Sequence, residues 1–209
     1  MKKIDYYFDF LSPFSYMSWV NTRDKNYEFE YFPVSLPNII SHYETKGPGQ
    51  IKPKRDYLTR ELFRYKTIHN IPFQFPKNIP FNSLYALRLS LKSVAGDSQK
   101  KLIDIFFRAA WEYGQDLGDS SVIENLLEKN GFDTEAMMNK ISSKEVKLEL
   151  RTNIENALKQ GVFGVPSFIV DNELFWGNDS LKYLELKLNN EDPLPVKEYE
   201  KFLNDFPMN

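Results

Sequence analysis

The sequence has no cysteine and very little histidine. Among its 209 residues none is cysteine, and only His42 and His69 are histidines. Without thiols the chain can neither form disulfides nor act as a dithiol oxidoreductase. A zinc site would need an unusual share of carboxylate ligands, so we expect no metal and interpret both histidines as surface or packing residues.

Long apolar segments and an excess of one charge are also missing. No stretch approaches the roughly 18 uninterrupted apolar residues of a membrane-spanning helix. The first residues, Met1–Tyr6, lack the apolar core of a signal peptide. The formal net charge is −2 and basic residues alternate with acidic ones, so no general field attracts nucleic acid. We therefore expect a cytoplasmic protein that binds neither membranes nor nucleic acid.

Residues 4–34 show the periodicity of two strands separated by a helix. Residues Ile4–Phe10 and Tyr27–Val34 alternate in the two-residue period of strands. Between them, Ser12 occupies a helix N-cap position and Pro13 the first helical position. The segment predicts a strand, a tight turn, a helix and a second strand.

The middle of the chain, from residue 35 to residue 160, shows helical periodicity and no further strand. A capping-box spacing links Ser142 to Glu145 at the start of the last of these helices. Expected helices run near Pro53–His69, Ser83–Val94, Ser98–Tyr113, Ser120–Lys129 and Ser143–Lys159.

Strands return near the C-terminus. Ser167–Val170 and Glu173–Trp176 flank a tight turn and predict a hairpin, and a last helix begins near Asp179. The order predicts an α/β class, a thioredoxin-like fold whose βαβ and ββα halves are separated by a helical insertion. We assign residues 1–45 and 150–209 to the thioredoxin-like domain and 46–149 to the insertion. Other α/β folds share parts of this order, so the motifs must decide.

Four short motifs agree with one family. They are Tyr7-Phe8-Asp9-Phe10-Leu11-Ser12-Pro13-Phe14-Ser15, Lys54-Arg55-Asp56-Tyr57 with its continuation to Ile71-Pro72-Phe73, Phe163-Gly164-Val165-Pro166, and Leu174-Phe175-Trp176-Gly177-Asn178-Asp179. In this order they resemble the 2-hydroxychromene-2-carboxylate isomerases and the related kappa-class glutathione transferases, which are related to DsbA-type oxidoreductases. The resemblance spans nearly the whole chain.

The resemblance implies a site that binds glutathione as cofactor. Ser12 stands at the first position of the redox turn, so its hydroxyl is expected to bind the glutathione sulfur and to be the catalytic residue. Pro166 is expected to be a cis-proline, and Val165 to pair its backbone with the cysteinyl unit. By residue type alone, Ser12 is only an N-cap and X-Pro bonds are usually trans.

The same resemblance assigns the two ends of glutathione. Asn178 and Asp179 are expected to bind the γ-glutamyl end, and Lys54 the glycine carboxylate. By residue type alone, the first two form a turn and a helix cap, and Lys54 belongs to a solvated first turn. Thr45 stands near the position where kappa-class transferases carry an asparagine, so one glutathione contact of that family is left unassigned here.

The activity implied is a glutathione-dependent isomerisation of an unsaturated aromatic 2-oxo acid. A kappa-like transferase or peroxidase, and a redox-inactive binding module, are the alternatives. We expect a homodimer, in which residues after Pro193 form a closing arm or part of the contact. Candidates for an aromatic substrate wall, each with a core role as its alternative, are Trp19, Phe63, Tyr85 and Trp111; Arg64 or Arg88 could meet the substrate's anionic end.

Overall fold

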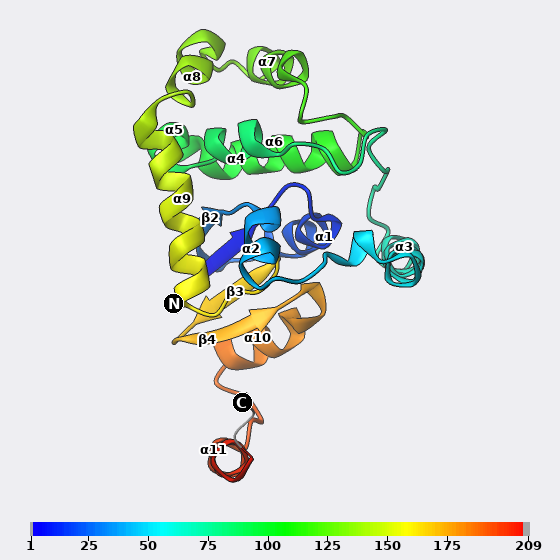
Figure 1. The fold of residues 1–209 in the computed structure, drawn as a ribbon, viewed down its shortest axis with the longest axis vertical. Coiled ribbons are helices and arrows are strands. Elements are labelled where there is room, and N and C mark those ends of the chain that lie inside the picture. Colours follow the sequence, from blue (N-terminus) through cyan, green and yellow to red (C-terminus); the bar gives the residue numbers. More distant parts are fainter. Residues whose placement is uncertain (1, 207–209) are drawn as a thin grey trace.

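The computed structural model describes residues 2–206 and has a four-stranded sheet at its centre (Figure 1). The strands are β1 (Lys3–Phe8), β2 (Glu28–Pro33), β3 (Ser167–Val170) and β4 (Glu173–Trp176), in the order β2-β1-β3-β4. β1 and β2 are parallel, and helix α1 (Pro13–Thr22) forms the crossover between them. β3 is antiparallel to β1, and β4 to β3. The strand predictions are confirmed, although β1 ends at Phe8 rather than at Phe10.

Aromatic residues fill the core on both sides of β1. Ile4, Tyr6, Tyr7 and Phe8 are all at most 1% exposed, so this strand is covered on both faces. The Tyr6 ring stacks on that of Phe168 in β3, with centroids 4.7 Å apart. A central strand buried on both faces positions the turn that follows it, which carries Ser12.

Helices make up the long connection between β2 and β3. The elements are α2 (Leu36–His42), η1 (Pro48–Gln50, a 3₁₀ helix), α3 (Lys52–Ile68), α4 (Leu84–Leu89), α5 (Lys92–Ala95), η2 (Gly96–Ser98), α6 (Gln99–Trp111), α7 (Ser120–Lys129), α8 (Thr134–Lys140) and α9 (Lys144–Lys159). In Figure 1, α4 to α8 lie above the sheet, α9 runs down its left side and α3 stands apart to the right. α6 packs on α1, and α9 packs on β2 and α2. The predicted domain boundary between residues 149 and 150 falls inside α9, and the division into two domains stays a prediction.

One predicted helix is broken in the structure. The segment predicted as Ser83–Val94 is divided into α4 and α5, and Leu91 has an extended backbone with φ −66° and ψ 145°. The Gln99 side chain donates to the Ser90 carbonyl oxygen at 2.9 Å. This bond from a distant side chain takes a carbonyl that a continuous helix would use.

The capping-box prediction was also wrong by one residue. The N-cap of α9 is Ser143, whose Oγ accepts from the Val146 N–H at 3.3 Å. Helices α2 and α8 were not predicted. Each has only seven residues, which is shorter than the stretch over which an apolar stripe indicates a helix.

After β4 the chain forms η3 (Asn178–Ser180), α10 (Leu181–Leu188) and α11 (Val196–Asp205). The helix predicted to begin near Asp179 therefore begins at Leu181, behind a short 3₁₀ turn, and it is not the last one, because α11 was not predicted. α11 lies apart from the rest of the molecule, beyond α10 (Figure 1). Within residues 2–206, no helix is both long and apolar enough to cross a membrane.

Candidate active site

Ser12 begins α1 as its N-cap, as predicted. Its backbone is extended, with φ −90° and ψ 114°, and its Oγ accepts from the Ser15 N–H at 3.2 Å. Pro13 follows in the first turn, and that turn contains no acidic residue. The positive end of the helix dipole is therefore not neutralised by the helix itself, and it favours an anion at this position.

The Ser12 hydroxyl also faces a segment far away in the sequence. Its Oγ donates to the Val165 carbonyl oxygen at 3.2 Å, across a separation of 153 residues. The Val165–Pro166 peptide bond is cis, as the resemblance implied. In the part of the chain that the structure describes, the Val165 N–H donates to no acceptor. The structure thus brings Ser12 next to Val165 and Pro166.

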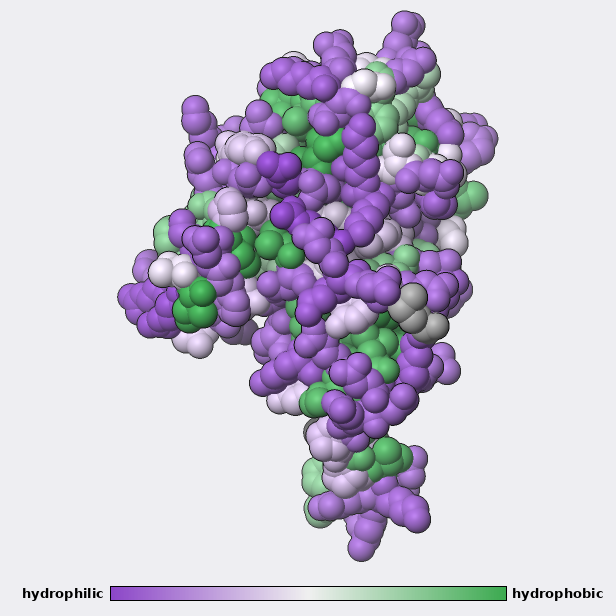
Figure 2. Space-filling view, turned by 180° about the vertical axis from the view of Figure 1, so that it is seen from behind, coloured by the Kyte–Doolittle hydropathy of each residue, from purple (hydrophilic) through white to green (hydrophobic). Residues whose placement is uncertain are grey.

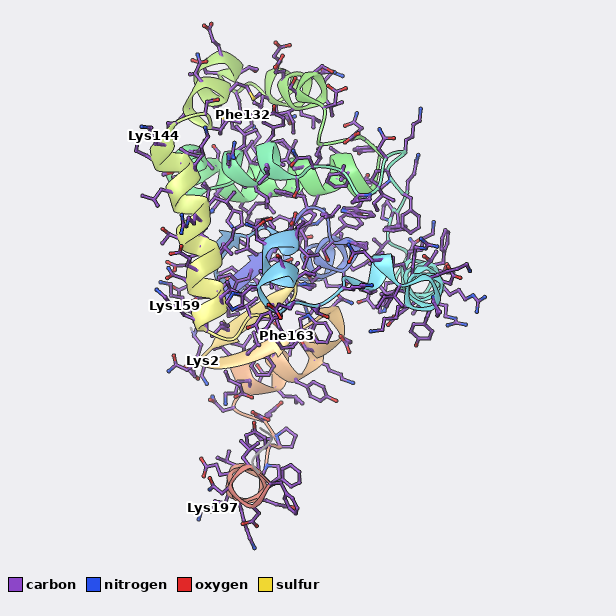
Figure 3. The ribbon with its side chains drawn as sticks, viewed as in Figure 1. Lys2, Phe132, Lys144, Lys159, Phe163 and Lys197 are labelled. Carbon is purple, nitrogen blue, oxygen red and sulfur yellow. The ribbon has the colours of Figure 1, made fainter. Side chains whose placement is uncertain are left out.

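The two C-terminal motifs form one structural unit beside this turn. The Gly177 N–H donates to the Pro166 carbonyl oxygen at 2.9 Å. The Trp176 indole lies over Gly164, where a Cβ atom would come within 2.7 Å of the indole nitrogen. Phe163, labelled in Figure 3 between the end of α9 and the strands, packs on Trp176 with ring centroids 4.9 Å apart. Gly164 and Gly177 are thus required by close packing and by backbone conformation, respectively.

Asn178 and Asp179 are adjacent in sequence but differ in environment. Asn178 is only 7% exposed, and its Oδ1 accepts from Asn21 Nδ2 at 2.9 Å. Asp179 is exposed and forms no ion pair with any residue in the range 2–206. A ligand can therefore reach the Asp179 carboxylate directly, whereas the Asn178 amide is held by the protein.

Lys54 lies in the first turn of α3, where it is exposed. It lines a small hollow of about 310 Å³ together with Pro48, Pro53, Tyr57 and Leu58. No contact in the structure joins it to Ser12 or Val165. The only buried residue of the whole helix is Leu62. The Lys54 ammonium group is thus accessible, but it stands on an element that the body of the protein contacts only sparsely.

Asp9 was noticed in the sequence only as part of a motif, and the structure gives it a distinct position. It is fully buried, and its two carboxylate oxygens accept from the Leu11 N–H at 3.0 Å and the Leu36 N–H at 2.8 Å. Burial raises the pKa of Asp9, while these bonds and the Ser83 hydroxyl act in the opposite direction. Asp9 therefore connects the Ser12 turn to the start of α2.

The aromatic candidates for the substrate wall differ in how deeply they are buried. Trp19 and Trp111 are buried, and their indole nitrogens donate to Asp104 and to the Phe10 carbonyl oxygen, so both belong to the core. Phe63 is 48% exposed on α3, whereas Tyr85 is half-buried on α4.

Arg64 and Arg88, the candidates for the substrate's anionic end, also differ in exposure. Arg64 is exposed on α3, whereas Arg88 is half-buried on α4. The Nε atom of Arg88 is buried and lacks a hydrogen-bond partner in the described part of the chain. Residues 2–206 contain no group of at least three His, Cys, Asp or Glu side chains placed to hold a metal ion.

Comparison with known proteins places this geometry among related enzymes. Residues 3–189 match the family described as DSBA-like thioredoxin domain. A 2-hydroxychromene-2-carboxylate isomerase from Sphingobium xenophagum is 30% identical over 190 residues, covering 88% of this chain and 96% of that protein. Glutathione S-transferase kappa 1 from Rattus norvegicus is 26% identical, covering 92% and 93%. A solved structure of a 2-hydroxychromene-2-carboxylate isomerase superposes with a TM-score of 0.82 at 29% identity, covering 90% of this chain and 95% of that one.

Proposed function

Because this chain belongs to the 2-hydroxychromene-2-carboxylate isomerase family of DSBA-like thioredoxin domains, we propose that it is a glutathione-dependent isomerase of that type. The resemblance seen in the sequence is confirmed, and the chain is an enzyme of a family with isomerase and glutathione-transferase relatives. The observation that carries the proposal is the Ser12 hydroxyl at the start of α1, facing the Val165 carbonyl. Since the chain has no cysteine, the reactive sulfur must be supplied by a bound thiol.

The start of α1 is sufficient to hold the glutathione sulfur as a thiolate. Lowering the pKa of a thiol from about 8.5 to near neutrality requires roughly 2 kcal/mol. A hydrogen bond to a charged group contributes about 1.5–3 kcal/mol, and a helix N-terminus about 0.3–1 kcal/mol more. The Ser12 hydroxyl and the first turn of α1 therefore supply the required stabilisation together.

Glutathione binding would replace one hydrogen bond by three. In the structure the Ser12 hydroxyl donates to the Val165 carbonyl oxygen. The cysteinyl N–H of glutathione can take over that carbonyl, while the Val165 N–H donates to the cysteinyl carbonyl. The Ser12 hydroxyl is then free to rotate toward the sulfur. The thiolate is thus recognised only when the peptide backbone of glutathione is in place.

Charged groups at the two ends of glutathione have partners of opposite sign. The exposed carboxylate of Asp179 suits the γ-glutamyl ammonium group, and the exposed ammonium of Lys54 suits the glycine carboxylate. Asn178 lies beside Asp179 and offers an amide to the γ-glutamyl carboxylate. These assignments rest on complementary charge and on the matched motifs.

The reaction proposed is a reversible conjugate addition. The thiolate sulfur forms a bond to the β-carbon of an α,β-unsaturated 2-oxo acid, and the electron pair of the double bond moves to the carbonyl oxygen as an enolate. Rotation about the resulting single bond changes the geometry. Collapse of the enolate then breaks the carbon–sulfur bond and restores both the double bond and the thiolate. Glutathione is not consumed, as in the interconversion of 2-hydroxychromene-2-carboxylate and trans-o-hydroxybenzylidenepyruvate.

A kappa-like transferase or peroxidase is the second candidate, favoured by the 26% identity to the rat kappa enzyme. It would use the same thiolate but leave a stable conjugate or oxidised glutathione. Product analysis separates the two, because only the isomerase returns glutathione unchanged. Membership of an enzyme family favours both over a redox-inactive binding module.

A homodimer is the oligomeric state that we propose, and α11 supports it. Figure 2 shows this helix as a separate lobe bearing apolar surface. Its apolar side chains recur at helical spacing and are 43–62% exposed: Val196, Tyr199, Phe202, Leu203 and Phe206. If the apolar face of α11 in each protomer packed on the other protomer, the total buried area would be on the order of 1,500 Å², as a stable dimer requires. The polar face has two lysines and three acidic residues, a net charge of −1 that does not suit an anionic membrane.

Sedimentation of the full chain tests the dimer. Phe202→Glu should give a monomer, whereas Lys201→Glu on the polar face should leave the dimer intact. A native chain that sediments as a monomer at micromolar concentration would contradict this part of the proposal. The expected cytoplasmic location remains a prediction that cell fractionation would check.

The cofactor assignment is tested by titrating glutathione into the native protein and Ser12→Ala by calorimetry. Thiolate absorbance is followed across pH in the same samples. We expect the native protein to bind glutathione with a lowered thiol pKa, and Ser12→Ala to restore most of the ordinary value. No binding at millimolar glutathione would refute the proposed function.

A further inference from the structure

Asn21 lies in the last turn of α1, outside every motif that indicates the site. Its side-chain nitrogen Nδ2 is 2.6 Å from the Tyr65 hydroxyl oxygen and 2.9 Å from Asn178 Oδ1. An amide nitrogen carries two hydrogens, so both of its donors are used. Asn21 and Tyr65 are half-buried and Asn178 is buried, so these bonds are shielded from water.

These two bonds join the elements that carry the proposed glutathione contacts. α1 has Ser12 at its N-cap, α3 bears both Lys54 and Tyr65, and η3 contains Asn178. α1 also packs directly on η3. Asn21 therefore joins α1 and α3 to η3, at the end of α1 opposite Ser12 and at the end of α3 opposite Lys54.

Ser12 and Asn21 stand at opposite ends of α1. They are nine positions apart, which corresponds to about 13 Å along a helix axis. The thiol belongs to the middle residue of glutathione, so the γ-glutamyl end of the ligand lies within this distance of the sulfur. A helix that begins at the sulfur can thus hold, with a side chain from its last turn, the residue that binds the γ-glutamyl end.

The bond from Asn21 also decides which end of the Asn178 amide is free. Because Asn178 Oδ1 accepts from Asn21, the Asn178 Nδ2 group is left as the donor for a ligand. A donor suits the α-carboxylate of a γ-glutamyl group, while the neighbouring Asp179 suits its ammonium group. We propose that Asn21 is a positioning residue that fixes the orientation of the Asn178 amide and thereby selects the γ-glutamyl end of glutathione. This inference rests on the proposed function.

The test compares two ligands that share the thiol and the glycine carboxylate. Glutathione has the γ-glutamyl group and the dipeptide cysteinylglycine lacks it. Binding of each is measured by calorimetry for the native chain and for Asn21→Leu, which has a similar size but no donor. We expect Asn21→Leu to bind glutathione roughly tenfold more weakly, as for one lost hydrogen bond, with no change for cysteinylglycine. The bound thiol pKa should stay lowered, since Ser12 is untouched.

Asn21→Asp is the sharper variant because it keeps the size and reverses the polarity. A carboxylate at this position would attract the Asn178 NH₂ group and turn the Asn178 oxygen toward the ligand carboxylate. We expect a loss of glutathione affinity at least as large as in Asn21→Leu, again without an effect on the dipeptide. Asn153→Leu is the matched control: Asn153 is also half-buried and donates to the Pro33 carbonyl oxygen at 3.3 Å, on another part of the fold.

The outcomes separate this inference from the proposed function. If the native chain binds no glutathione, both are refuted. If it binds glutathione no better than cysteinylglycine, or if the Asn21 variants weaken both ligands equally, only the inference is refuted. A thermal unfolding curve is recorded for each variant, and Asn21→Asp provides the test if Asn21→Leu does not fold.

Discussion

The Ser12 turn and helix α3 differ in how firmly the rest of the molecule holds them. Ser12 is 4% exposed and is bonded to Ser15 and to Val165. Helix α3 has 17 residues, of which only Leu62 is buried. The turn is thus fixed by the backbone of β1 and β3, whereas Lys54 stands on a loosely packed helix.

This contrast follows from what each part must do in the proposed reaction. A sulfur atom that forms and breaks a covalent bond must be placed accurately, because a small displacement lowers the rate strongly. A carboxylate attracted by a lysine needs only a charge within reach, since the interaction falls off slowly with distance. We therefore expect changes at the Ser12 turn to have larger effects than changes on α3.

The largest effect is expected from Ser12→Ala. Losing the hydrogen bond to the thiolate should lower kcat/KM for trans-o-hydroxybenzylidenepyruvate by roughly 10- to 150-fold. Ser15→Ala is the matched control, because Ser15 is buried in the same turn and its hydroxyl has no partner among the residues described. It should change kcat/KM by less than about threefold. Equal losses in both variants would mean that the turn, and not the hydroxyl, is what matters.

The next largest effect is expected from Gly177→Ala. Gly177 has φ +89°, and an added Cβ atom would lie 2.6 Å from Asp179 Oδ1. The strain should cost about 1–3 kcal/mol of stability and displace Asn178 and Asp179, so we expect glutathione affinity to fall about tenfold.

A second glycine variant serves as a control that separates the effect of backbone strain on stability from the effect on glutathione binding. Gly131 has φ +77°, and no atom lies within 4 Å of an added Cβ. Gly131→Ala should lower the free energy of unfolding by a similar amount, about 1 kcal/mol, without changing glutathione binding. Urea unfolding and calorimetry of both variants give the comparison. A loss of affinity in both would contradict the assignment of the Gly177 turn to the ligand site.

Asp9→Asn should weaken the support of the Ser12 turn in a pH-dependent way. Both oxygens of a carboxyl group can accept, whereas the amide nitrogen of Asn cannot, so one of the two backbone N–H groups would lose its acceptor. We therefore expect a loss of about 1–3 kcal/mol in the free energy of unfolding. Burial raises the pKa of Asp9 above its ordinary value of 3.8. As pH rises from 3.8 to the folded-state pKa, the folded native protein keeps its proton while the unfolded chain loses it. Native stability from this group therefore falls across that range and then levels off.

The stability deficit of Asp9→Asn should accordingly be greatest below pH 4 and shrink as pH rises. Urea unfolding of both proteins between about pH 3 and pH 8 measures it. A deficit that grows with pH would show that the bonds to the ionised carboxylate outweigh its burial.

The smallest effect is expected from Lys54→Ala. An exposed ion pair contributes about 0.2–1 kcal/mol, so glutathione should bind at most about fivefold more weakly, and the difference should vanish at high salt. Lys52→Ala is the control, since Lys52 is exposed on the same turn and is paired with Asp56. A loss larger than that of Ser12→Ala in glutathione affinity would reverse the contrast between the two regions.

Local patterns predicted most of the elements. The strands, the Ser12 cap and α7 (Ser120–Lys129) follow from side-chain periodicity and capping, which act over a few residues. The break between α4 and α5 did not, because it depends on Gln99, which reaches Ser90 only in the folded chain. Helix α2 was missed for a related reason: its first N–H is held by Asp9, which is 27 residues away in sequence.

Only the candidate site residues that lie within the matched motifs could be predicted from the sequence. Ser12, Val165, Pro166 and Asn178 could be proposed as site residues because they stand in recognisable motifs. Asn21 was missed, since an asparagine in the last turn of a helix has no distinctive pattern.

The sequence by itself determined that any sulfur chemistry must use a ligand, because a chain without cysteine has no thiol. It also determined the order of the strands and of the longer helices, since these depend on neighbouring residues. Only the tertiary structure decided that Ser12 meets Val165, because the pairing of β1 with β3 brings the Ser12 hydroxyl to a backbone carbonyl 153 residues away. It likewise decided that Asn21 holds Asn178, since a hydrogen bond between distant side chains depends on the packing of whole helices.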